Sequence, residues 1–250
     1  MNKRKIIVKY LIYLKNELIL TETTKVTTVL EIVLLRHPET QWNRDKLIQG
    51  HTDIPPLDPT VPDSLVDALA ALGDVVSVYS SDLQRCSLPA FDLYRKLVKN
   101  AEADKERNEF PWPIPFVQTR YLRERSFGVL EGKSYHALGV DDVRSVGELF
   151  YCRGEIEAGE SVHDALGRAS VISDEILHPK GCIKKGVIPV VTHGCFLNYL
   201  ITAFEQCHQF DPSNLSVYRA AGNLSGFRVQ IDNFHGYQVR EIAQFPEAKP

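Results

Sequence analysis

The chain has 250 residues, of which 44% are hydrophobic and 24% are charged, which suits one globular domain with a sizeable core. The formal net charge of −3 gives no indication that a nucleic acid is the main partner. Neither an internal repeat nor a low-complexity tract interrupts the sequence, and no linker separates two domains.

The cysteines are odd in number and scattered, and they form no CxxC pair. This pattern predicts neither a zinc site nor a disulfide framework. Reduced thiols in a cytoplasmic compartment are the simpler interpretation. The five cysteines are Cys86, Cys152, Cys182, Cys195 and Cys207.

The first twenty residues are basic, and apolar residues recur in them at helical spacing, at Ile7, Leu11, Leu14 and Leu18. Charged residues interrupt the apolar run and no small-residue cleavage site follows it, so neither a membrane span nor a secretory signal is predicted. We expect residues 1–27 to be a basic amphipathic or disordered extension ahead of one domain at 28–250. An organelle-targeting presequence, or a helix in which residues 1–20 contact a membrane surface, is the alternative.

Strands are expected to alternate with helices along the rest of the chain. This order predicts an α/β fold, a three-layer sandwich in which helices flank a central, mostly parallel sheet. In chain order we expect a strand at 29–35, a turn-rich loop at 43–62, a helix at 64–72, a strand at 75–79, a helix from Ser81 or Asp82 to 98, an exposed loop at 99–113, a strand at 114–117, a helix at 160–177, a strand at 187–192, a helix at 196–207, and strands at 217–218, 227–231 and 238–242.

Two of the apolar strands end in a histidine, in LLRHPET at His37 and in VVTHG at His193. Ligands bind beyond the carboxyl ends of strands in open α/β sheets, so the two side chains could converge on one site. Each histidine alone is more simply a loop residue with its hydrogen bonds satisfied.

Charged residues near these strand ends suit a phosphate ligand. Arg36 adjoins His37, and Arg85 lies in the first turns of the helix after the second strand. The planar guanidinium group matches phosphate oxygens, and a strand-to-helix junction adds backbone donors. Glu124 lies on a glycine-punctuated loop, and a carboxylate beside such a cationic clamp is a plausible general acid and base. Taken singly, each arginine is more simply a solvated surface charge, and Glu124 a loop partner of a neighbouring arginine.

Six segments in chain order resemble the motifs of the histidine phosphatase superfamily, which includes the cofactor-dependent phosphoglycerate mutases. RHPETQWN is similar to RHGETxWN, QGHTDIPPL to QGxxDxPL, and SSDLQRC to SSDLxRA. LRERSFGVLEG is similar to LxExxFGxxEG, GESVHDALGR to GESxxxxxxR, and VVTHG to VVSHG. One such motif would be weak, whereas the ordered set is specific and covers the chain from about 32 to 242.

The resemblance implies a role for each matching residue. His37 would be the nucleophile that forms a phosphohistidine, and Glu124 would be the general acid and base, whereas Glu131 would be structural. His37 must be neutral to attack, so its other ring nitrogen should donate to a backbone carbonyl. The residues expected to hold the phosphoryl group or substrate are Arg36, Arg85, His193, Asn43, Gln49 and Gly50. Because these residues supply the charge stabilisation that phosphoryl transfer needs, neither a metal nor a cofactor is implied.

Two positions depart from or add to the family pattern. Pro38 replaces the family glycine, which removes a backbone N–H and fixes φ. Cys195 follows His193-Gly194, where a small buried filler is favoured over a reactive thiol.

The leading hypothesis is a metal-independent histidine acid-type phosphatase that hydrolyses a small phosphorylated metabolite. A phosphoglycerate mutase is the first alternative, although the mutases usually carry TGWxD where this chain has a loop beginning Gln49-Gly50, and a longer insertion after the glutamate segment. A catalytically inactive phosphate-binding module is the second, supported by Pro38. The substrate and the oligomeric state are open at this point. We expect the pocket wall to come from segments 99–113 and 134–152, because loops carry specificity.

Overall fold

The computed structural model describes residues 29–103, 113–139, 151, 155–177, 185–206, 214–232 and 238–246. The expected N-terminal extension, most of the loop expected at 99–113, and three of the five cysteines lie outside the described residues. The other two cysteines, Cys86 and Cys195, are buried. Within these ranges, no helix has the length and apolar character needed to cross a membrane.

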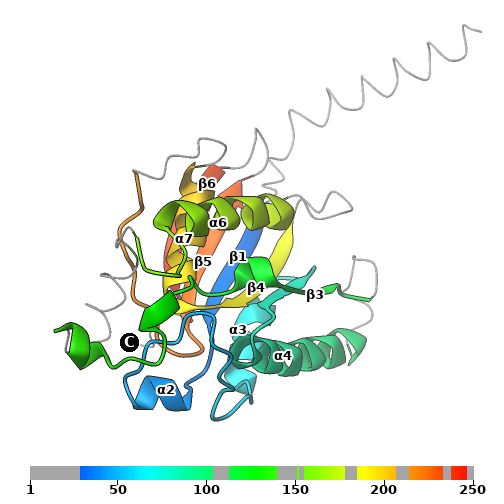
Figure 1. The fold of residues 1–250 in the computed structure, drawn as a ribbon. Helices are drawn as coiled ribbons and strands as arrows, with labels where there is room; N and C mark the ends of the chain where they lie inside the picture. Colours follow the sequence, from blue (N-terminus) through cyan, green and yellow to red (C-terminus); the bar gives the residue numbers. More distant parts are fainter. Residues whose placement is uncertain are drawn as a thin grey trace, which may run out of the picture.

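A six-stranded sheet forms the middle layer, with the strand order β3-β2-β4-β1-β5-β6 (Figure 1). The strands are β1 (Val29–Arg36), β2 (Val78–Ser81), β3 (Phe116–Thr119), β4 (Gly186–Thr192), β5 (Gly226–Asp232) and β6 (Gln238–Phe245). The first four in spatial order pair in parallel, and β5 runs antiparallel to both of its neighbours. The predicted mostly parallel sheet is therefore confirmed.

Helices cover both faces of this sheet, as Figure 1 shows. They are α3 (Asp63–Leu72) and α4 (Gln84–Ala103) on one face, and α6 (Val162–Leu177) and α7 (Gly194–Gln206) on the other. Successive side chains of a strand point to opposite faces. Accordingly, Leu30, Ile32 and Leu34 of β1 pack into the core under α6 and α7, while Val33 and Leu35 pack into the core under α3 and α4. The three-layer sandwich is confirmed, and alternating residues of β1 contribute to both of its cores.

Among the expected boundaries that differ from the observed ones, two have an identifiable cause. β2 begins at Val78 rather than at 75, because Val75 makes only an isolated bridge to Val187. Helix α4 continues to Ala103, so residues 99–103 of the expected loop are helical. This stretch reads Lys-Asn-Ala-Glu-Ala, and Ala, Lys and Glu are good helix formers, so its charge alone did not indicate a loop.

The strand expected at Val217–Tyr218 is wrong. The chain from 214 to 222 is irregular, and the side chain of Asn198 takes the place of a strand partner. Its Oδ1 accepts from the backbone N–H of Arg219 at 2.7 Å, and its Nδ2 donates to the Arg219 carbonyl at 3.0 Å. This pairing fixes the segment beside the end of α7 that faces the carboxyl end of β1.

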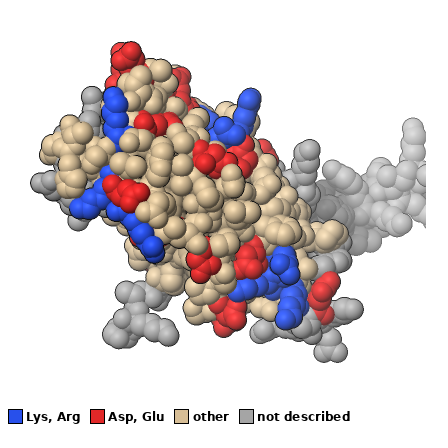
Figure 2. All heavy atoms as spheres, turned by 60° about the horizontal axis from the view of Figure 1, so that its bottom comes forward, with Lys and Arg blue, Asp and Glu red and all other residues tan. Residues whose placement is uncertain are grey.

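The carboxyl ends of β1, β2 and β4 meet at one edge of the sheet, beside the short helix α2 (Gln41–Arg44) (Figure 1). Three 3-10 helices follow β3, at Arg120–Leu122, Gly128–Leu130 and Tyr135–Leu138. Figure 2, in which the lower side of Figure 1 comes forward, shows charges of both signs interspersed around a largely uncharged middle.

Candidate active site

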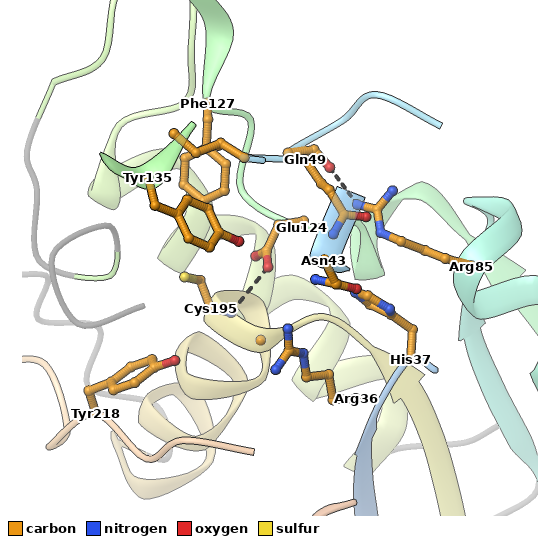
Figure 3. Close-up of a pocket in the computed structure, with 13 residues that line it drawn as sticks. Arg36, His37, Asn43, Gln49, Arg85, Glu124, Phe127, Tyr135, Cys195 and Tyr218 are labelled. Atoms are coloured by element: carbon orange, nitrogen blue, oxygen red, sulfur yellow. Dashed lines mark hydrogen bonds between the residues drawn. The ribbon is translucent and has the colours of Figure 1, made fainter. Parts of the chain in front are cut away.

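His37 directly follows β1 and lies in a pocket at this edge (Figure 3). Its Nδ1 is 2.7 Å from the carbonyl oxygen of Pro38, which can only accept, so Nδ1 carries the hydrogen. The expected hydrogen bond to a backbone carbonyl is confirmed. Burial first, and then the charges of Arg85 and Arg36, hold the pKa of His37 well below its ordinary value. The ring is therefore neutral, and its Nε2 keeps a free lone pair.

Arg85 is fully buried and is held at three points. Its guanidinium group donates to the carbonyls of Gly50 at 2.6 Å and Thr52 at 2.8 Å, and its Nε donates to Nδ1 of His193 at 3.1 Å. These bonds fix the guanidinium plane beside His37, where Arg85 lines the pocket.

His193 lies one layer deeper, behind Arg85. Because Nδ1 accepts from Arg85, the neutral ring carries its hydrogen on Nε2, which donates to Oγ of Ser81 at 2.9 Å. Burial, followed by the charge of Arg85, holds the pKa of His193 well below its ordinary value. The ring centroids of His37 and His193 are 5.3 Å apart, so the two histidines do converge. His193 is not among the described residues that line the pocket, so its direct contact with a phosphoryl group stays a prediction.

Arg36 ends β1 and lines the pocket from the other side of His37. One terminal nitrogen donates to the carbonyl of Ala221 at 2.9 Å, which anchors the side chain. Its Nε is buried and has no hydrogen-bond partner among the described residues. A buried donor without a partner is costly, so this N–H is suited to an anion in the pocket.

The predicted substrate-binding residues Asn43, Gln49 and Gly50 also line the pocket. Oδ1 of Asn43 accepts from the backbone N–H of Thr40 at 3.0 Å, which leaves the amide N–H₂ as the free donor. The hydroxyl of Thr40 donates to Oε1 of Gln49 at 3.0 Å, which orients that amide in the same way. Gly50 has a φ of +56°, and a Cβ there would collide with the carboxylate of Glu131, so only glycine fits the turn that supports Arg85.

Glu124 faces His37 across the pocket and is fixed by the first turn of α7. Its Oε1 accepts from the backbone N–H groups of Arg125 and Phe196, both at 2.9 Å. Its Oε2 accepts from the N–H of Cys195 at 3.1 Å, its single hydrogen bond in the part of the chain that the structure describes. Together these backbone N–H groups fix the orientation of the Glu124 carboxyl group in the pocket.

Two further carboxylates hold the loops around Glu124. Glu131 accepts from the backbone N–H groups of His51, Thr52 and Phe127, which agrees with its expected structural role. Glu160 pairs with Arg168 at 2.8 Å. Burial raises the pKa of Glu160, but the hydrogen bond and charge of Arg168 outweigh that effect and hold the pKa below its ordinary value.

Sequence reasoning missed several residues that line or support the pocket. Arg168 was seen only as the end of a motif, yet it donates to the carbonyls of Tyr121, Arg123 and Glu124 and so shapes the loop that carries Glu124. The outer wall is mostly apolar and aromatic. It consists of Ile48, Phe127, Tyr135, Cys195 and Tyr218.

Of the expected wall segments, 134–152 contributes Tyr135, whereas none of the described residues of 99–113 lines the pocket. No pattern in the sequence indicated that Tyr218 lines the pocket, because it lies in an irregular segment that was expected to be a strand. Cys195 is 6% exposed and packs in the core at the pocket wall, as expected for a small filler. In the ranges given above, no group of three His, Cys, Asp or Glu residues is arranged to hold a metal ion.

The three-layer sandwich with this sheet order is a phosphoglycerate mutase-like α/β fold, and a buried neutral histidine between two arginines lies at the carboxyl ends of its strands. The family model described as the histidine phosphatase superfamily (branch 1) matches residues 32–235. The chain belongs to the histidine phosphatase superfamily.

Known proteins are similar to this chain over most of its length. Phosphoglycerate mutase-like protein 4 of Arabidopsis thaliana is 29% identical over 170 residues, which cover 66% of each chain. A probable phosphatase of Schizosaccharomyces pombe is 27% identical over 212 residues, 83% of this chain and 89% of that one. The structure of a mycobacterial glucosyl-3-phosphoglycerate phosphatase superposes with a TM-score of 0.60 at 20% identity, over 88% of this chain and 100% of that one, which supports the fold.

Proposed function

We propose that this protein is a phosphomonoesterase that hydrolyses a small phosphorylated metabolite through a phosphohistidine on His37. The observation that carries the proposal is the fixed tautomer of His37. Its Nδ1–H is bound to the Pro38 carbonyl, so the nucleophilic Nε2 faces the pocket between Arg36 and Arg85. The S. pombe relative named as a probable phosphatase supports hydrolysis.

In the first step, Nε2 of His37 attacks phosphorus and the bond from phosphorus to the ester oxygen breaks. Protonated Glu124 gives its proton from Oε2 to that oxygen, so the alcohol leaves neutral. The guanidinium groups of Arg36 and Arg85 stabilise the equatorial oxygens, and Nε of Arg36 gains the partner it lacks. His193 is a positioning residue, because it holds Nε of Arg85.

In the second step, a water molecule attacks the phosphohistidine and the phosphorus–nitrogen bond breaks. The Glu124 carboxylate takes a proton from the water, which restores the protonated acid. Inorganic phosphate leaves, and His37 returns to its neutral state. The hydrogen bond to Pro38 keeps the Nδ1–H in place throughout, so the ring needs no tautomer change between the two steps.

Pro38 does not argue for an inactive module. The family glycine would offer an N–H at this position, but the group that orients His37 is the carbonyl, which proline retains. Every side chain needed for the two steps is present in the pocket or directly behind it.

A phosphoglycerate mutase is the second candidate, because a mutase of Chlamydia caviae is 25% identical over 207 residues. In a mutase the phosphohistidine would return its phosphoryl group to a phosphoglycerate instead of to water. The loop at Gln49 and Gly50, which differs from the mutase motif, favours hydrolysis.

The test is hydrolysis of an aryl phosphate by the purified protein with and without EDTA. We expect full activity in EDTA and a loss of several orders of magnitude in His37→Ala, because the nucleophile and its clamp act as a unit. Activity that vanishes in EDTA and returns with a divalent ion, or that survives in His37→Ala, would refute the proposal.

A further inference from the structure

We infer that the pocket selects phosphomonoesters whose alcohol part is uncharged and carries an aromatic or other flat apolar ring. The inference rests on the proposed function and names the substrate class of the same site. It comes from the placement of the charges in the pocket and from its outer wall, and the two chemical steps do not use that wall.

The positive charges that line the pocket lie around His37, where they would contact a single phosphoryl group. Among the described lining residues, only Arg36 and Arg85 are cationic, and both act on His37. A phosphate dianion beside His37 would use both charges. A second phosphate or carboxylate on the substrate would find no cation in the described lining, and it would share the pocket with the carboxyl group of Glu124.

The outer wall instead offers aromatic rings. Phe127 is 4% exposed and Tyr135 is 8% exposed, so both rings are held by the core and stand ready to contact a ligand without further ordering. The ring of Tyr218 packs on that of Tyr151, with 5.7 Å between their centroids. Stacked or edge-on contacts between aromatic rings add to the gain from burying apolar area, so this wall suits a flat ring.

The two phenols supply neutral polar contacts to the same ligand. The hydroxyl groups of Tyr135 and Tyr218 point into the pocket (Figure 3), and neither has a hydrogen-bond partner in the part of the chain that the structure describes. Burial raises the pKa of both tyrosines, so both remain protonated donors near neutral pH. They are suited to uncharged oxygen or nitrogen acceptors on the ring or its linker.

A binding experiment tests the proposed substrate class separately from turnover. Benzylphosphonate and 4-carboxybenzylphosphonate cannot be hydrolysed, and they differ by one carboxylate far from the phosphonate. We expect calorimetry with the full chain to give at least about tenfold weaker binding for the carboxylated compound, because its second anion would lose water in the pocket and find no further cation in the described lining. Equal or tighter binding of the carboxylated compound would overturn the inference, as would tighter binding of a trimethylammonium-bearing alkylphosphonate than of benzylphosphonate.

Kinetics and a variant provide the second arm. The value of kcat/KM should be higher for benzyl phosphate than for 4-carboxybenzyl phosphate. It should also be higher for benzyl phosphate than for ethyl phosphate. Tyr218→Leu should lower the ratio of kcat/KM for benzyl phosphate to kcat/KM for ethyl phosphate. The control Val217→Ala changes a neighbouring side chain that is 81% exposed, and it should leave this ratio unchanged. A ratio that is unaffected by Tyr218→Leu contradicts the inference. If no phosphate ester is hydrolysed, the proposed function fails, and the phosphonate affinities still decide the binding class.

Discussion

Replacing Arg168 with methionine should destabilise the protein far more than an average surface change. Arg168 makes five hydrogen bonds, two to Glu160 and three to the carbonyls of Tyr121, Arg123 and Glu124. Its guanidinium carbon also lies 4.1 Å from the ring centroid of Phe196. Methionine retains the apolar stem and none of these polar contacts.

The size of the effect follows from what the substitution leaves behind. The side chains of Arg168 and Glu160 are 12% and 20% exposed, so the carboxylate would stay largely buried without its partner. Removal of one member of a buried pair costs about 3–5 kcal/mol. Because Glu160 retains some access to water and the N–H of Ser126, we expect a value near the lower end, about 3 kcal/mol.

The assay is urea unfolding at pH 7, with Arg95→Met as the matched control. Arg95 is an exposed residue of α4, so its replacement should change the free energy of unfolding by less than about 0.5 kcal/mol.

The pKa of Glu160 is lowered in the folded state, so the contribution of this carboxylate to the free energy of unfolding is present above its ordinary pKa and is lost as the pH falls through the folded value. The difference between wild type and Arg168→Met should therefore shrink in acid. A loss below about 1 kcal/mol at pH 7, or one independent of pH, would refute this account of the Glu124 loop.

Three other predictions follow from the site. Glu124→Gln should lower kcat/KM for an alkyl phosphate about 10²–10⁴-fold and for nitrophenyl phosphate much less, because nitrophenolate needs no proton to leave; equal losses would remove Glu124 from the acid role. Since the folded pKa of His37 is lowered, the unfolded chain binds the proton first, so stability should fall as the pH drops below 6.5. His37 should contribute at most about 1.4 kcal/mol per pH unit to this loss in the free energy of unfolding. Urea titrations at pH 7.5 and 5.5 should show that His37→Gln removes this contribution, and an unchanged pH dependence would contradict the neutral ring. Isomerisation of phosphoglycerate, followed by NMR, should be slower than hydrolysis, and the reverse order would favour a mutase.

The sequence predicted the residues whose positions follow from strand ends and ordered motifs. His37 and Arg36 end a short apolar strand, and Arg85 begins the helix after another, so the fold brings them to one edge of the sheet. Glu124 could be placed only through its motif, because nothing in its local pattern shows that the first turn of α7 binds its carboxylate.

Other features depend on contacts that no local pattern encodes. Tyr218 reaches the pocket because Asn198, on a different element, holds the backbone of Arg219. The partners of His193 could not be foreseen either: Arg85 and Ser81 contact its two ring nitrogens. In both cases the outcome depends on tertiary hydrogen bonds, which a single sequence does not reveal.

Acid-labile phosphorylation of His37 is the most direct test of the central claim. The protein is mixed with a ³²P-labelled phosphomonoester, quenched during turnover in alkali, digested and analysed by mass spectrometry. We expect a base-stable adduct on the peptide that contains His37, absent in His37→Ala and retained in the control Arg95→Met. An adduct on Cys195 or on a serine, or turnover with no label on His37, would contradict the mechanism.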